Sequence, residues 1–266
     1  GAGVTAPGQA MYATGTVECI TPAFAEPVLS DDLREHNLCT YDHALAGMYT
    51  TVAFSLTGGN LLTWFRDELG NREMQAAAAG GPGACERLLN LAGDEPSDLL
   101  VLPYWTPSGT PYFDTDTPGA VVGLRMSTTR GELLRGLLEG VAFEMLLNLR
   151  ILSRCGCEVR ELRAIGGGAK SRLWTQLKAD VLDRPDAGSE EALEHLDVTE
   201  AGCLGAALLA RAAIGGDNPA DLARRWVRVT GELAPRDDRA SVYRERFETW
   251  RRLYPAVQQL PPGTHA

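Results

Sequence analysis

The most informative stretch of this sequence is Arg163-Ala-Ile-Gly166-Gly167-Gly168-Ala169-Lys170-Ser171-Arg172-Leu173-Trp174. The run 159–165 leads into the three glycines, and an amphipathic segment, 171–182, follows them. This order predicts a strand, a tight turn and a helix. Glycines let backbone N–H groups approach an anion or a flat base, and a helix N-terminus adds partial positive charge. A packed strand-to-helix turn without any ligand explains the same residues equally well.

The composition is that of an ordinary soluble globular protein. Of its 266 residues, 44% are hydrophobic and 23% are charged, which argues against a disordered chain. The formal net charge of −10 argues against a nucleic-acid partner, because such proteins normally carry a basic face. It does not argue against a nucleotide, whose phosphates can be held by backbone N–H groups and a metal ion.

Cysteine spacing and hydropathy predict where the protein works. The six cysteines form no CxxC pair, and Cys155-Gly156-Cys157 is too cramped for half a zinc site. We therefore expect reduced thiols and a cytoplasmic protein. No run of about 18 apolar residues is present, so no membrane contact is expected. The chain opens with Gly1-Ala2-Gly3 instead of Met, which suggests a fragment of a longer protein.

The first half of the chain predicts strands followed by short helices. Residues 10–20 should form a hairpin that turns at Gly15-Thr16, and residues 39–55 should supply more strand with a turn at 46–47. The Asn/Gly-rich start at 57–60 predicts a helix over 61–69. Residues 71–93 are expected to be loops around one short helix, 85–92.

The second half predicts helices that alternate with single strands. The expected elements are a strand at 99–104, a loop at 105–119, a helix at 130–153 with the capping box Thr129/Glu132, a polar surface loop at 186–197, a small-residue helix at 198–209 with Thr199 as N-cap, and an aromatic-faced helix at 238–254 ended by Pro255. This order is typical of an α/β layered domain.

Taken together, several segments resemble the C-terminal domain of the FGGY carbohydrate kinases, the family of xylulokinase, gluconokinase and glycerol kinase. In the family's order they are Thr14-Gly15-Thr16, Thr57-Gly58-Gly59 with Trp64-Phe65-Arg66-Asp67, Leu102-Pro103-Tyr104 through Asp114, Gly123-Leu124 with 134–143, 165–180 and 200–207. The resemblance implies an actin-like ATPase (ribonuclease H-like) domain, α/β with a mixed sheet flanked by helices. It predicts one domain over 1–266, with a core of about 1–215 and a helical tail, 216–266. The N-terminal sugar-binding domain would be absent.

The resemblance also implies site residues. Gly15 and Thr16 would bind ATP phosphates, Gly167 and Gly168 would lie near the purine and ribose, and Ser171 would lie near the base. Gly109 is a further predicted nucleotide contact. From the residues alone, a plain hairpin turn explains Gly15-Thr16 and a helix N-cap explains Ser171.

The remaining catalytic parts are expected outside the chain or on the ligand. Mg²⁺ would be held by ATP phosphates and water, so no protein metal ligand is predicted. The general-base aspartate would lie upstream of Gly1, so no catalytic residue is assigned in this chain. Glu18 is not assigned that role, because alternation along its strand leaves open whether its side chain points toward the turn or away from it. Asp114 is expected to brace its loop.

The predicted function is the ATP-binding half of a sugar or polyol kinase, inactive by itself. Its partners would be a small sugar or polyol, bound with the missing N-terminal domain, and a second copy in a homodimer. The alternative is a non-catalytic nucleotide-binding or interaction domain, because Ser108-Gly109 stands where many resembling kinases carry Glu-Arg. P-loop and dinucleotide motifs are absent, and so is the Gly-x-Ser-x-Gly of a hydrolase.

Overall fold

The computed structural model describes residues 1–183, 192–198 and 200–260. Its main sheet is built from β1 (Gln9–Thr14), β2 (Glu18–Phe24), β3 (Tyr41–Asp42), β4 (Tyr49–Thr50), β5 (Ala53–Ser55), β8 (Glu161–Ile165), β9 (Leu193–Leu196) and β10 (Val229–Leu233). The strand order is β10-β9-β8-β1-β2-β4-β3, and β5 also pairs with β2. Pairs β1–β8 and β8–β9 are parallel, whereas β1–β2 and β9–β10 are antiparallel. The predicted mixed sheet is confirmed.

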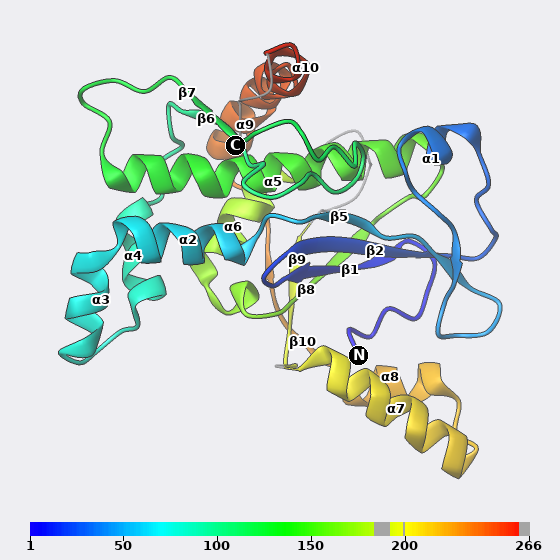
Figure 1. Ribbon diagram of the computed structural model, residues 1–266. Coiled ribbons are helices and arrows are strands. Elements are labelled where there is room, and N and C mark those ends of the chain that lie inside the picture. The colour runs from blue at the N-terminus through cyan, green and yellow to red at the C-terminus, as the bar shows by residue number, and fades with distance from the viewer. Residues whose placement is uncertain (184–191, 199, 261–266) are drawn as a thin grey trace.

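Helices cover this sheet on two sides. They are α1 (Asp31–Glu35), α2 (Gly59–Leu69), α3 (Asn71–Ala78), α4 (Ala84–Ala92), α5 (Arg130–Arg154), η1 (Gly168–Lys170), α6 (Arg172–Val181), α7 (Ala201–Gly215), α8 (Pro219–Trp226), α9 (Asp237–Trp250) and α10 (Leu253–Gln258). A small second sheet pairs β6 (Leu100–Leu102) with β7 (Ala120–Val122). In Figure 1, α5 lies above the strands of the main sheet, and α7 and α8 lie below them.

The long helix α5 is the centre of the core. Thr129 caps it by accepting a hydrogen bond from the backbone N–H of Glu132 at 3.1 Å, as the sequence predicted. Nearly every residue from Gly131 to Leu152 is buried, because the sheet, β6, α4 and α6 contact it from several sides. A helix that is apolar on most of its circumference is stable only when it is surrounded in this way.

The polar segment 186–197 is not a surface loop throughout. Residues 184–191 lie outside the described part, but Leu193–Leu196 form β9, a strand between β8 and β10. Leu193 is buried, while Glu194 pairs with Arg163 of β8 at 2.8 Å (Oε2 to Nε). The prediction of a loop was wrong because a cross-strand charge partner makes a polar strand acceptable.

The predicted helical tail also contains a strand. Residues 229–233 form β10 and join the main sheet, and the aromatic face of α9 enters the core through Tyr243, Phe247 and Trp250. The prediction that Pro255 ends this helix was wrong, since α9 stops at Trp250 and Pro255 lies inside α10.

Two further boundaries differ from the sequence prediction. Residues 71–78, expected to be loop, form α3, in keeping with their strong helix formers. Helix α7 begins at Ala201 with Glu200 in the N-cap position, and the predicted cap Thr199 lies outside the described residues.

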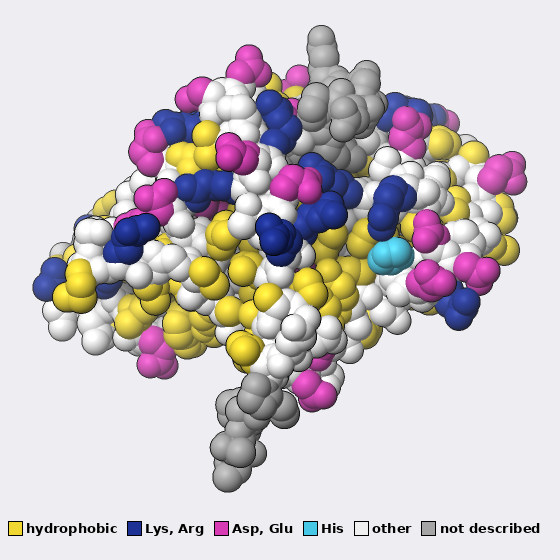
Figure 2. Space-filling model, turned by 90° about the horizontal axis from the view of Figure 1, so that it is seen from above, with side chains coloured by type: hydrophobic (Ala, Val, Ile, Leu, Met, Phe, Trp, Pro, Cys, Tyr) yellow, Lys and Arg dark blue, Asp and Glu magenta, His cyan; other side chains and the backbone are white. Residues whose placement is uncertain are grey.

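Charges on the outer face of α9 are mixed in sign. Figure 2, the view from above, shows acidic and basic side chains interspersed around a more hydrophobic central area. Ion pairs there include Arg246–Asp98 at 3.0 Å and Arg150–Glu248 at 2.8 Å. In the described part of the chain, no helix combines the length and hydropathy that a membrane crossing requires.

Candidate functional site

The two predicted glycine turns meet at one edge of the sheet. Strands β1 and β8 are parallel neighbours, and Ala13 pairs with Ile165 near their carboxyl ends. The turns that follow both strands therefore start side by side. Ligands of open α/β sheets bind outside the carboxyl ends of the strands, so this edge is the candidate site.

The hairpin turn after β1 is braced by the start of α2. Gly15 N–H donates to the carbonyl of Val17 at 3.1 Å, and the N–H groups of Gly59 and Asn60 donate to the carbonyls of Gly15 and Thr16 at 2.9 and 3.0 Å. Thr16 itself is exposed at the tip. The predicted turn at Gly15-Thr16 is confirmed, and its backbone is held by a helix N-terminus.

The turn after β8 uses its glycines in different ways. Gly166 has φ of +93°, and an ideal Cβ there would lie 2.5 Å from the carbonyl oxygen of Thr14, so only glycine fits. An added Cβ on Gly168 would overlap Cγ2 of Thr14. Gly167 is exposed, and nothing lies within 4 Å of its added Cβ. Gly167 thus faces open space, whereas its neighbours pack against β1.

Ser171 follows as the N-cap of α6. Its hydroxyl accepts a hydrogen bond from the backbone N–H of Trp174 at 3.3 Å. The capping role left open by the sequence is confirmed, and the predicted contact with a base stays a prediction.

Gly109 is the one predicted site residue that lies apart from this group. It is buried, and an added Cβ would meet the carbonyl oxygen of Phe54 in β5, so Gly109 lets its loop lie flat on that strand. The neighbouring Thr110 N–H donates to the same carbonyl at 2.9 Å. The structure gives Gly109 a packing role, and its nucleotide contact remains a prediction.

Asp114 braces the same loop, as expected. Its carboxylate accepts hydrogen bonds from Thr117 and from the hydroxyl of Tyr254 at 2.9 Å. Although burial raises it, these hydrogen bonds lower the pKa of Asp114 to about 2.

Sequence reasoning missed a buried ion pair beneath the two turns. Lys178 of α6 and Glu18 of β2 lie 2.5 Å apart (Nζ to Oε1), with side chains 1% and 0% exposed. Burial lowers the pKa of Lys178 to about 8, although the Glu18 carboxylate opposes that shift. The side chain of Glu18 points into the core, which answers the orientation that the sequence left open. The signal that could have shown this was its spacing of two residues from the apolar Ile20, which puts both side chains on the same face of the strand.

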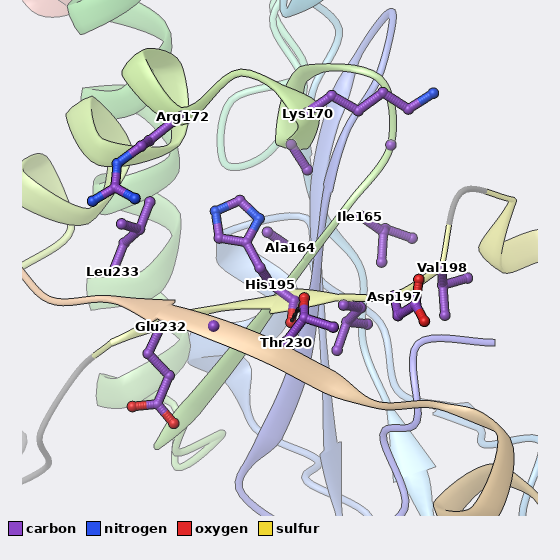
Figure 3. A pocket seen from close by; sticks show the side chains of 14 residues that line it. Ala164, Ile165, Lys170, Arg172, His195, Asp197, Val198, Thr230, Glu232 and Leu233 are labelled. Atoms are coloured by element: carbon purple, nitrogen blue, oxygen red, sulfur yellow. Dashed lines mark hydrogen bonds between the residues drawn. The ribbon is translucent and has the colours of Figure 1, made fainter.

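A cavity of about 440 Å³ lies beside the turn after β8. Residues of β8, β9 and β10 contribute to its lining. Figure 3 shows the imidazole of His195 and the guanidinium of Arg172 on the same side of these strands, and Lys170 extending away from them. Burial, and then the Arg172 charge, lowers the pKa of His195 below its ordinary value. Gly166 belongs to the lining of this cavity and Thr16 does not.

The chain matches known proteins along most of its length. The sequence profile of the FGGY family of carbohydrate kinases, C-terminal domain, matches residues 10–214. A xylulose kinase from Staphylococcus epidermidis is 26% identical over 264 residues, which cover 98% of this chain and 49% of that protein. A gluconokinase from Bacillus licheniformis is 27% identical over 256 residues, covering 94% and 48%.

A solved structure shares the fold of this chain. The crystal structure of "a xyloylose kinase from Brucella ovis" superposes with a TM-score of 0.82 at 25% identity, covering 97% of this chain and 50% of that chain. The chain thus spans about half the length of the relatives that it matches. The family profile and this shared fold show that the chain belongs to the FGGY family of carbohydrate kinases, as a C-terminal domain.

Proposed function

We propose that this chain is the ATP-binding half of a carbohydrate kinase that transfers the γ-phosphate of ATP to a hydroxyl of a sugar or polyol. The observation that carries the proposal is the meeting of the two glycine turns at the carboxyl ends of β1 and β8. Family membership supports it, as do relatives named xylulose kinase and gluconokinase.

The proposed roles follow from phosphoryl transfer, which needs positioning and charge neutralisation more than covalent chemistry. Thr16, exposed at the hairpin tip, would donate its hydroxyl to a phosphate oxygen, and Gly15 would keep the backbone close to the phosphates. Gly167, Gly168 and Ser171 would border the purine and ribose.

The magnesium ion would be bound with ATP, by its phosphates and by water, as is usual for Mg²⁺ in such sites. That ion would neutralise phosphate charge.

The sugar site and the general-base aspartate are proposed to require an N-terminal domain, because the relatives are about twice as long. This chain alone should then bind nucleotide and phosphorylate nothing. A cytoplasmic location fits the six cysteines, all of which are free. The homodimer stays a prediction that sedimentation can check.

The second candidate is a nucleotide-binding domain without catalysis. Ser108 stands in the loop where the resembling kinases carry a charged pair, and its hydroxyl accepts a hydrogen bond from Asp114 N–H at 2.9 Å, a bracing role. This candidate predicts nucleotide binding but no sugar phosphorylation in any longer form of the protein.

Calorimetry with Mg·ATP on the chain and on Gly167→Val tests the first proposal. Nothing in the protein lies within 4 Å of a Cβ at Gly167, so the variant should keep the melting temperature. A side chain in the nucleotide's path should raise the Kd at least about tenfold, or 1.4 kcal/mol. The matched control is Gly83→Val, since Gly83 is equally open and exposed and lies on another loop.

Two outcomes would contradict the proposal. One is the absence of any melting-temperature rise with saturating Mg·ATP, since a ligand at 100 times its Kd should add about 2.7 kcal/mol. The other is an unchanged Kd in Gly167→Val. Turnover of pentoses, hexoses or glycerol by this chain alone would refute only the claim that it is inactive by itself.

A further inference from the structure

The buried pair Lys178–Glu18 is unusual because it joins helix α6 to strand β2 with both side chains at most 1% exposed. Desolvating two charges costs about as much as their attraction returns, so such a pair adds little net stability. Apolar residues of similar volume would fill the same space at no loss.

Lys178 and Glu18 are both fully engaged. The ammonium of Lys178 also donates to Oγ1 of Thr14 at 2.7 Å and lies 4.7 and 4.5 Å from the ring centroids of Tyr12 and Trp174. The hydroxyl of Tyr12 donates to the second carboxylate oxygen of Glu18. The cluster thus fixes side chains of β1, β2 and α6 in one arrangement.

This arrangement reaches three glycine positions around the candidate site. Thr14, oriented by Lys178, presents Cγ2 to Gly168 and its carbonyl oxygen to Gly166. Glu18 presents Cγ to Gly58, at 2.8 Å from an added Cβ, just before α2. Contacts of the cluster therefore reach the turn after β8 and the N-cap of α2, the helix whose first N–H groups bind the hairpin turn.

We propose that Lys178 and Glu18 are positioning residues that set the spacing of the two glycine turns and of the N-terminus of α2 for the nucleotide. The inference rests on the proposed nucleotide-binding function. Because the two charges cancel, the pair acts through the placement of Thr14 and Gly58 rather than through an electric field on the phosphates.

The test compares two neutralised pairs in the 266-residue chain. Glu18→Gln with Lys178→Met removes the proposed positioning pair and keeps the side-chain volumes similar. The control, Arg135→Met with Glu139→Gln, removes another buried pair, 2.9 Å apart with both side chains 1% exposed. That pair joins α5 to α9 through Tyr243, away from the glycine turns. Each protein is measured for its melting temperature and for its Kd for Mg·ADP by calorimetry.

The expected result is a Kd raised about tenfold in the Glu18/Lys178 double variant, and less than about threefold in the control. Equal effects of the two double variants at equal loss of stability would overturn the inference, and so would an unchanged Kd in the first. If the unsubstituted chain binds no Mg·ADP, the proposed function falls together with the inference.

Thr14→Val keeps the test decisive if the double variant does not fold. Valine retains the shape of Thr14 and removes only the hydroxyl to which Lys178 donates. The Kd should then rise about threefold or more while the chain stays folded. An unchanged Kd in a folded Thr14→Val protein refutes the positioning role.

Discussion

Gly168→Ala should destabilise the protein although it adds a single methyl group. An ideal Cβ at Gly168 would lie 2.1 Å from Cγ2 of Thr14, whereas non-bonded carbons prefer about 3.5–4.0 Å. Thr14 is 2% exposed, and its hydroxyl is held by Lys178 at 2.7 Å. The threonine therefore cannot rotate its methyl away without losing that hydrogen bond.

The size of the effect follows from this overlap. Inserting a methyl group into a well-packed site costs about 1–3 kcal/mol. We expect a loss of about 2 kcal/mol in the free energy of unfolding, measured by urea titration. In a chain of this size, that loss corresponds to a fall in melting temperature of about 4–8 °C.

Two further variants make the argument refutable. Gly167→Ala adds its methyl to open space and should change stability by less than about 0.5 kcal/mol. Combining Gly168→Ala with Thr14→Ser removes the clashing methyl but keeps the hydroxyl, so most of the loss should be recovered. If Gly168→Ala matches Gly167→Ala, or if Thr14→Ser recovers nothing, the turn is not packed on β1 as described.

Two other expectations concern buried charges. Burial raises the pKa of Glu144 to about 8, a shift that hydrogen bonds from Tyr104 only partly oppose, so the folded protein binds this proton more tightly than the unfolded chain. The stability that protonated Glu144 contributes is thus complete below about pH 4.5 and is lost as pH rises towards 8. In urea titrations over this range, the free energy of unfolding of Glu144→Gln should rise relative to that of the parent by at most about 1.4 kcal/mol per pH unit. Identical pH profiles of the two proteins would contradict this. Arg236→Met leaves the fully buried Asp180 without its cation and should cost about 3 kcal/mol, the low end for a broken buried pair because Arg236 is 33% exposed. Arg239→Met, whose acidic partner is 77% exposed, should cost less than about 1 kcal/mol, and equal losses would show that Asp180 does not need Arg236.

The elements that could be predicted from the sequence are those with local signals. The 130–153 helix has a regular apolar period and a capping box, and the hairpin at Gly15-Thr16 has a turn sequence between two β-rich runs. The cap at Ser171 could be predicted for the same reason. Each of these depends on residues within a few positions of one another.

The parts that could not be predicted depend on distant partners. Leu193–Leu196 looks like loop until Arg163, on another strand, supplies the charge partner of Glu194. Lys178 lies on an amphipathic helix, where a lysine normally marks the exposed face, and only the fold brings Glu18 to it. The family resemblance predicted Gly109 as a nucleotide contact. Its packing against Phe54 depends on a loop that folds back onto β5.

Helix α6 connects the candidate site to the part of the chain beyond the family profile, which ends at residue 214. Two buried charges on α6, two residues apart, are bound on different sides: Lys178 by Glu18 and Thr14 under the glycine turns, and Asp180 by Arg236 just before α9. Because one helix carries both residues, the contact with Arg236 and the contact with Thr14 together constrain the position of α6. Through Arg236, the described part of the tail thus contacts the helix whose Lys178 binds Thr14 beneath the glycine turns. Strand β10 of the tail also joins the main sheet, so the described part of the tail contacts both the helix and the sheet that carry the site.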